Sequence, residues 1–145
     1  TALNLHGSRA QALMAAGLRT VRGDVAAAGP GDAVWLAPDV GDAEADRLAR
    51  GLHGKGVPLF GTRRGHLDAG CSVVVRCDPR DAGMLAAALA RRILDGEAPG
   101  EIGVRRVARR RLELNLDAAR RLGHDVPLAV VAAADHVLPS LGRRE

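Results

Sequence analysis

Residues 33–60, AVWLAPDVGDAEADRLARGLHGKGVPLF, decide the fold of this 145-residue chain. The run Ala33–Ala37 is short and apolar, which is typical of a buried strand. Apolar residues at the i, i+3, i+4, i+7 spacing of a helix follow it: Ala45, Leu48, Ala49 and Leu52. We expect Asp42 to cap this helix. A second short apolar run, Val57–Phe60, comes next, so the stretch predicts two parallel strands joined by a crossover helix.

The same alternation continues on both sides of this stretch. Further strands are expected at Ala2–His6, Leu18–Arg22, Ser72–Arg76 and Leu112–Leu116, and further helices at Ser8–Ala16, Pro79–Leu94, Asp117–Leu122 and Leu128–Leu138. Residues 63–66 are interpreted as a polar loop after a strand, and residues 96–103 as a second loop. The pattern predicts an α/β fold with three layers, in which a mainly parallel sheet of five or six strands is flanked by helices.

The composition is that of one globular domain. Apolar residues make up 47% of the chain and charged residues 26%, and no apolar run approaches the roughly 20 residues of a membrane helix. The net charge is +4, but residues 1–100 carry 12 basic and 11 acidic side chains, so the excess lies in residues 101–145. The basic run there, Arg105–Arg111, has no aromatic neighbours on which bases could stack. We therefore interpret it as a solvated strand face and expect no nucleic-acid partner.

The two cysteines, Cys71 and Cys77, flank the apolar strand at residues 72–76. Six steps along a strand span roughly 20 Å, whereas a disulfide needs its Cα atoms within about 7 Å. We expect both thiols to be reduced and to act as small buried apolar groups. Two cysteines are also too few for a zinc site of the usual cysteine spacing.

Candidate ligand-binding residues come from the rule that open parallel sheets bind ligands at the carboxyl ends of their strands. Polar residues follow four of the expected strands or their first turns: His6 with Ser8, Asp39, Thr62 to His66, and Asp78. Each has an ordinary structural alternative, such as a helix cap for Ser8 and Asp78 or a turn residue for Asp39. Together they predict a polar rim for a small ligand.

No sequence motif supports catalysis. The chain has no Gly-x-Gly-x-x-Gly or Gly-x-x-x-x-Gly-Lys-Ser/Thr loop for a nucleotide and no Gly-x-Ser-x-Gly elbow for a nucleophile. Its five histidines lack the spacing of metal ligands. His66 or Asp39 is possible as a general acid or base, yet no spacing supports that role. We expect no enzyme activity, no cofactor and no metal.

Several motifs, in a fixed order over about 100 residues, resemble one family. They are Asp32–Asp39, Gly56–Thr62, Asp68–Gly70, Arg92–Pro99, Leu114–Gly123 and Val126–Pro127. In these the chain is similar to the carboxyl-terminal lobe of extracytoplasmic substrate-binding proteins of ABC transporters, in the branch with tryptophan- and tyrosine-binding members. The resemblance implies a solute-binding protein whose ligand lies between two α/β lobes and which docks on a membrane permease.

The resemblance also implies a set of ligand-binding residues: Ser8, Asp39, Thr62 and Arg63. The chain departs from the family at three places, with Val40 where a polar residue is common, Arg63 where an acidic one is common, and Pro79–Arg80 in place of a tyrosine. An aromatic amino-acid ligand is therefore disfavoured, and an anionic or zwitterionic one, such as an amino acid or a small carboxylate, is favoured.

One lobe supplies only one wall of such a site, and the amino-terminal lobe of the family is missing from the chain. We expect an α/β lobe at residues 1–116 and a carboxyl-terminal helical segment, 117–145, that packs on a partner lobe or on a second copy. The resemblance places the protein outside the cytoplasm. A one-lobe sensory or regulatory domain of a signalling protein, or a small α/β enzyme, is the alternative.

Overall fold

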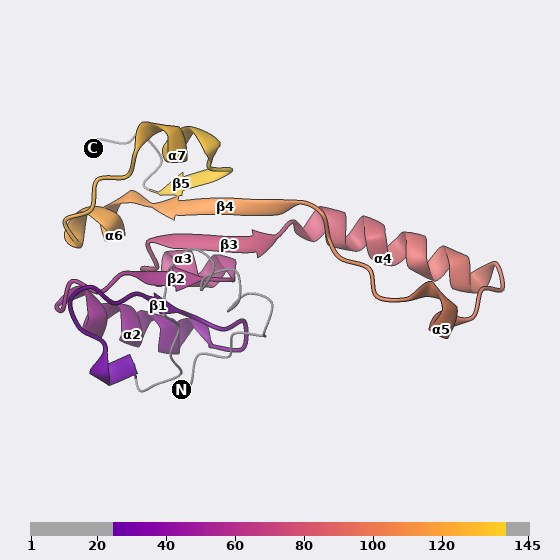
Figure 1. Cartoon of the computed structure of the whole chain (residues 1–145), viewed down its shortest axis with the longest axis horizontal. Helices are drawn as coiled ribbons and strands as arrows, with labels where there is room; N and C mark the ends of the chain where they lie inside the picture. The colour runs from indigo at the N-terminus through magenta and orange to yellow at the C-terminus, as the bar shows by residue number, and fades with distance from the viewer. Residues whose placement is uncertain (1–24, 139–145) are drawn as a thin grey trace. The chain divides into compact units, whose positions relative to one another are not determined.

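The computed structural model describes residues 25–138, which form two compact units (Figure 1). One unit, here called the sheet unit, contains residues 25–75 and 112–138 of the described chain. The other, here called the α4 unit, contains residues 76–111. The strands expected at Ala2–His6 and Leu18–Arg22, the helix expected at Ser8–Ala16 and the candidate residue Ser8 lie outside the described residues.

The described elements follow the order expected for an α/β chain. They are η1 (Val25–Ala27), β1 (Val34–Trp35), α2 (Asp42–His53), β2 (Leu59–Gly61), α3 (Arg64–Asp68), β3 (Val73–Cys77), α4 (Pro79–Leu94), α5 (Pro99–Ile102), β4 (Arg110–Asn115), α6 (Leu116–Arg121), α7 (Leu128–Ala133) and β5 (His136–Leu138). Helix α4 has the predicted bounds. The polar loop expected at residues 63–66 is instead the start of the short helix α3.

The five strands form one sheet in the order β1-β2-β3-β4-β5. The pairs β1–β2, β2–β3 and β4–β5 are parallel. Strand β4 runs against β3, since Asn115 N–H bonds to Ser72 C=O at one end and Asp78 N–H to Arg109 C=O at the other. The predicted α/β fold with a mainly parallel sheet is confirmed.

The core lies between one face of the sheet and helices α2 and α3. Alternate strand residues point into it, so that Val34, Leu59 and Val74 are buried while Trp35 and Phe60 lie on the other face. The helices contribute small and branched apolar side chains to the same cluster: Ala45, Ala49, Leu52 and Leu67. On the other face the Trp35 and Phe60 rings stack with centroids 6.0 Å apart. Close packing on α2 and α3 fixes where the ends of β1 and β2 lie.

Two sequence-based expectations about the ends of elements are wrong. The cap of α2 is the backbone of Gly41, and Asp42 is the first helical residue, whose carboxylate serves another purpose described below. The helix expected at Leu128–Leu138 stops at Ala133, because residues 136–138 pair with β4 as strand β5. Asp135 fixes this register: its side chain accepts a bond from Leu112 N–H, and its own N–H donates to Leu112 C=O.

The α4 unit is a long helix, a short helix and an extended return segment. Helix α4 is capped as predicted, with Asp78 accepting a bond from Arg80 N–H and Pro79 at its first position. None of its 16 residues is buried, and Met84, Leu94 and the following Val104 are 63%, 83% and 94% exposed. A helix owes most of its stability in a protein to packing of its apolar face. The α4 unit therefore offers apolar surface that the described chain leaves uncovered.

Both cysteines are free. Cys71 is fully buried before β3, as expected, and burial raises the pKa of its thiol to about 12. Cys77, at the far end of β3, is exposed, which corrects the interpretation that both are buried. The two thiols thus differ in access to solvent.

Candidate functional site

The loops that follow β1 and β2 meet at one edge of the sheet. The Thr62 hydroxyl donates a bond of 3.4 Å to the Leu36 carbonyl, which directly follows β1. Arg63 reaches the same loop, with Nη1 3.5 Å from the Pro38 carbonyl and 3.4 Å from the Val40 carbonyl. The exposed Asp39 lies in the turn between those two carbonyls. Three of the four predicted ligand residues, Asp39, Thr62 and Arg63, therefore share one edge.

The Arg63 guanidinium is paired with Asp42, the residue that the sequence predicts as the cap of α2. Its Nη2 atom lies 3.2 Å from Asp42 Oδ1, and the two side chains remain 44% and 54% exposed. A surface ion pair of this kind contributes little to stability, about 0–1 kcal/mol. Its effect is positional, because the pair sets a cation and an anion side by side at the rim.

His66 lies beneath the site and connects its two loops. The ring is fully buried, and its Nδ1 accepts a bond of 3.3 Å from Thr62 N–H. The Nε2 atom lies 2.9 Å from the Val40 carbonyl, so the partners assign the tautomer with the proton on Nε2. Both ring nitrogens are used, and His66 ties the β2 loop to the β1 loop.

Two glycines allow these close approaches. A Cβ atom on Gly61 would lie 2.6 Å from His66 Cβ and 3.0 Å from Val74 Cγ2. A Cβ on Gly65 would overlap the Asp42 carboxylate. The motif Gly61-Thr62-Arg63-Arg64-Gly65 thus places backbone where side chains would collide.

Sequence reasoning missed a second ionic cluster next to this edge. Glu113 on β4 is 1% exposed, although the alternation of the strand predicts that its side faces solvent. Its carboxylate lies 3.5 Å from Nη1 of Arg64, and Nη2 of Arg64 donates a bond of 2.9 Å to Nε2 of His136. The cluster joins α3, β4 and β5. Only the unexpected strand β5 brings His136 there, so no local pattern could have identified it.

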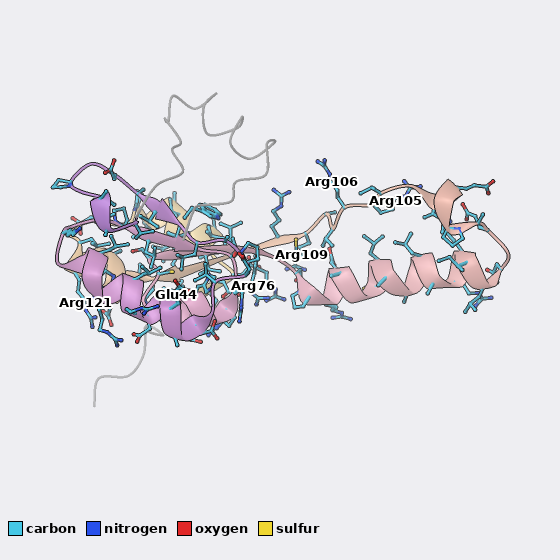
Figure 2. All side chains as sticks on the ribbon, turned by 90° about the horizontal axis from the view of Figure 1, so that it is seen from below. Glu44, Arg76, Arg105, Arg106, Arg109 and Arg121 are labelled. Carbon is cyan, nitrogen blue, oxygen red and sulfur yellow. The ribbon has the colours of Figure 1, made fainter. Side chains whose placement is uncertain are left out.

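Asp78, another predicted rim residue, serves a structural role within the α4 unit. Its carboxylate caps α4 and accepts a bond of 2.8 Å from Arg111 Nε, with Arg109 Nε at 3.6 Å. Burial raises the pKa of this carboxyl, but the bonds from Arg80 N–H and Arg111 outweigh that effect and the pKa lies below its usual value. The basic run was expected to be a solvated face, and Arg109 is 60% exposed, but Arg109 and Arg111 also form ion pairs with Asp78. Arg105 and Arg106 do project from the return segment (Figure 2).

Residues 25–138 contain no group of three or more side chains that could hold a metal ion. Within the same residues no helix combines the length and the apolar content needed to cross a bilayer. The geometry at the edge of β1 and β2 is that of a polar rim, with hydroxyl, guanidinium and carboxylate groups and no buried nucleophile paired with a base. Such a rim can hold a small charged ligand.

Comparison with known proteins gives a family and a fold. The family model described as ABC transporter substrate binding protein matches residues 31–138. No curated protein matches the chain at a significant level.

Two solved structures are similar to the chain. One is a conserved domain protein from Vibrio cholerae O1 biovar eltor, with a TM-score of 0.56 and 25% identity over 66% of this chain and 32% of that one. The other is an ABC domain from Streptococcus pneumonia solved in complex with L-Trp, with a TM-score of 0.61 and 20% identity over 74% of this chain and 37% of that one. The chain spans about a third of the length of each of these structures.

Proposed function

The chain belongs to the ABC transporter substrate-binding protein family, and from this premise we propose that it binds a small polar solute without converting it. The proposed site is the rim formed by Asp39, Thr62 and Arg63, with Ser8 as a further ligand residue from outside the described part. The observation that carries the proposal is the meeting of the β1 and β2 loops. Exposed polar groups from both loops converge there over the buried His66.

The neighbouring charges favour a zwitterion over a simple carboxylate. An anion that approaches Arg63 also meets Asp42, which is 3.2 Å from the same guanidinium. A ligand with both a carboxylate and an ammonium group satisfies both side chains, whereas a carboxylate alone must compete with Asp42. We therefore propose an amino acid or a similar small zwitterion. The solved relative in complex with L-Trp supports an amino acid as a class, although Val40 and Arg63 depart from the usual pattern of the family.

The second wall of the site is proposed to come from a second α/β lobe, as the coverage of about a third of each similar structure suggests. Ligand pockets bury about 70–90% of a small ligand, which one rim cannot do. Each unit by itself carries uncovered apolar side chains: Met84 and Leu94 in the α4 unit, and Leu128 of α7, 81% exposed, in the sheet unit. The packing of residues 117–145 on a partner lobe or a second copy stays a prediction.

A second copy of the chain is the competing occupant of that surface. Light scattering after gel filtration separates the two, because Met84→Glu with Leu94→Glu converts a dimer to a monomer only if a second copy covers α4. If the wild-type chain is already monomeric, the result supports a second α/β lobe, and not a second copy, as the partner of that surface.

Proteins of this family are usually extracytoplasmic and are typically not enzymes. For this chain we propose the same location, a membrane permease as partner of the loaded receptor, and no turnover. No observation on the described residues favours the alternatives, a sensory domain or a small α/β enzyme.

Thermal melting with a library of amino acids and small carboxylates tests the proposal. A ligand at 100 times its dissociation constant raises the free energy of unfolding by about 2.7 kcal/mol. We expect the shift with one or more amino acids and a loss of at least tenfold in affinity for Arg63→Ala. Arg47→Ala, which removes an exposed arginine from the same unit, is the matched control and should bind like wild type.

Because Arg63 also bonds to the Val40 carbonyl, Thr62→Val is measured as a second variant with milder structural effect. Equal affinities of wild type, Arg63→Ala and Thr62→Val would remove the site from the rim. Chemical conversion of any compound in the library would favour an enzyme.

A further inference from the structure

A cavity of about 350 Å³ lies in the sheet unit at the edge opposite the proposed solute site. It opens where β3 begins and β4 and β5 end, beside Gly70, Asn115 and Leu138, whereas Thr62 follows the end of β2. The other lining residues come from α2, from the end of α3 and from α6: Asp46, Ala49, Arg50, His53, Asp68, Ala69, Asp117, Ala118 and Arg121. We call it the α2–α6 cavity.

The α2–α6 cavity is partly open to solvent, and most of its lining residues are polar or charged. Ala49 and Ala118 lie at its base, where each is only 2% exposed. His53 closes one side, since its Nε2 lies 3.2 Å from the Gly70 carbonyl. A volume of about 350 Å³ is within the range of pockets that hold small molecules.

The arginines around the α2–α6 cavity differ in whether they have an ion-pair partner. Within the described part of the sheet unit, five of the six arginines have an ion-pair partner: Arg47, Arg50, Arg63, Arg64 and Arg120. Arg121 has none among these residues. Its exposed side chain, labelled in Figure 2, is among those that line the cavity. It is the cation most readily available for a ligand.

Two of the three carboxylates that line the α2–α6 cavity are only loosely paired. Asp46 is committed to Arg50 at 2.6 Å. In contrast, Asp68 is 3.8 Å from Arg64 and Asp117 is 3.5 Å from Arg120, both with at least half of their side-chain surface exposed. Those separations are at or beyond the limit of a strong charge-assisted hydrogen bond, which is about 2.7–2.9 Å. Each carboxylate can therefore accept a further ammonium group.

We propose that the α2–α6 cavity is a second binding site, separate from the rim of β1 and β2, for a small aliphatic zwitterion. The carboxylate of the ligand pairs with Arg121, its ammonium group lies against Asp68 and Asp117, and its short chain spans the cavity between them. A ligand with only one charge leaves one side of this rim unsatisfied, so the site selects for both charges.

Titration of the ¹⁵N-labelled chain tests the proposal, with amide chemical shifts as the readout. The probes are glycine, β-alanine, γ-aminobutyrate and 6-aminohexanoate, against propionate and ethylamine as single-charge controls. We expect saturable shifts at Ala49, Gly70 and Ala118 with at least one amino acid. Arg121→Gln should weaken that affinity at least tenfold, and Ala118→Leu, which fills the cavity, should abolish it.

Arg120→Gln is the matched control, since it removes the neighbouring arginine, which does not line the cavity. It should bind as well as wild type or slightly better, because it releases Asp117. Arg63→Ala should leave these shifts unchanged, so the two sites can fail independently. Absence of saturable shifts with every amino acid, equal shifts with propionate or ethylamine, or wild-type affinity in Arg121→Gln would each overturn the proposal.

Discussion

At the scale of single residues, His66 is the side chain on which the proposed solute site depends most. His66→Leu removes the acceptor of Thr62 N–H and leaves the Val40 carbonyl with only the 3.4 Å contact to Arg63 Nη1. An unsatisfied buried polar group costs about 1–3 kcal/mol, so we expect the free energy of unfolding to fall by about that amount. Urea denaturation measures it. His124→Gln, at an exposed residue, should change stability by less than about 0.5 kcal/mol, and similar losses for both would contradict the role of His66.

The thiols should also separate by reactivity. The thiolate is the reactive form, and the pKa of about 12 at the buried Cys71 keeps that thiol protonated at neutral pH. Iodoacetamide is expected to label only the exposed Cys77 of the native protein. After unfolding in about 8 M urea it should label both cysteines. Mass spectrometry of the peptides reads this out. Labelling of native Cys71 at the rate of Cys77 would show that the start of β3 is open.

The sequence predicted Asp39, Thr62 and Arg63 because a general rule about strand ends applies to them directly. It did not predict Glu113 or the partnership of Arg64 and His136. The alternation of β4 assigns Glu113 to a solvated face, and the cover over it comes from α3, which lies 45 or more positions earlier in the chain. Burial by a segment so distant in the sequence cannot be predicted from the residues next to Glu113.

At the scale of elements, two glycine-to-alanine substitutions should change stability in opposite directions, one through helix propensity and the other through steric overlap. Gly51 lies in α2 with open space around its Cα, so Gly51→Ala should raise the free energy of unfolding by about 0.5–1 kcal/mol. Gly61→Ala places a Cβ 2.6 Å from His66 Cβ and should lower stability by about 1–3 kcal/mol through overpacking. Paired thermal melts check both. A stabilising Gly61→Ala would mean that the end of β2 yields without loss.

Helix α4 should respond to acid through its cap. Because the folded pKa of Asp78 lies below the unfolded value of 3.8, its contribution is complete above that value and is lost as the pH falls through the folded pKa. Asp78→Asn keeps a capping side chain but loses the charge that meets Arg111. We expect helicity and stability of this variant to depend less on pH below about 4 than those of wild type. Circular dichroism of both proteins from neutral to acid pH tests it, with Asp81→Asn as control.

Elements with strong local signals were predicted well. Helix α4 has a cap, a proline at its first position and a glycine at its end, and its bounds match. Ala134, Val137 and Leu138 also fit a helical spacing, so the sequence predicts helix where the structure has strand β5. Its pairing with β4, sealed by Asp135, overrides that spacing. The spacing of residues within one segment does not show which strand that segment will pair with.

At the scale of the whole molecule, the order of motifs predicted the family and the α/β fold, which the comparisons support. The sequence located surplus apolar surface in residues 117–145 alone. Four of the six large apolar side chains that are exposed in the described residues lie in the α4 unit: Met84, Ile93, Leu94 and Val104. The spacing of α4 looks like that of an ordinary core helix, so only its lack of burial distinguishes it.

The antiparallel pairing of β3 with β4 has one more consequence, for engineering. The two strands are the arms of a hairpin, and the α4 unit is a cassette inserted at its tip. Asp78 N–H donates to Arg109 C=O, so these two residues form a hydrogen-bonded pair, which a two-residue Asn-Gly turn can close directly. Excising residues 79–108 and splicing in Asn-Gly should leave a miniature that still unfolds cooperatively in urea. An unfolded product would show that the sheet unit needs residues 79–108 in order to fold.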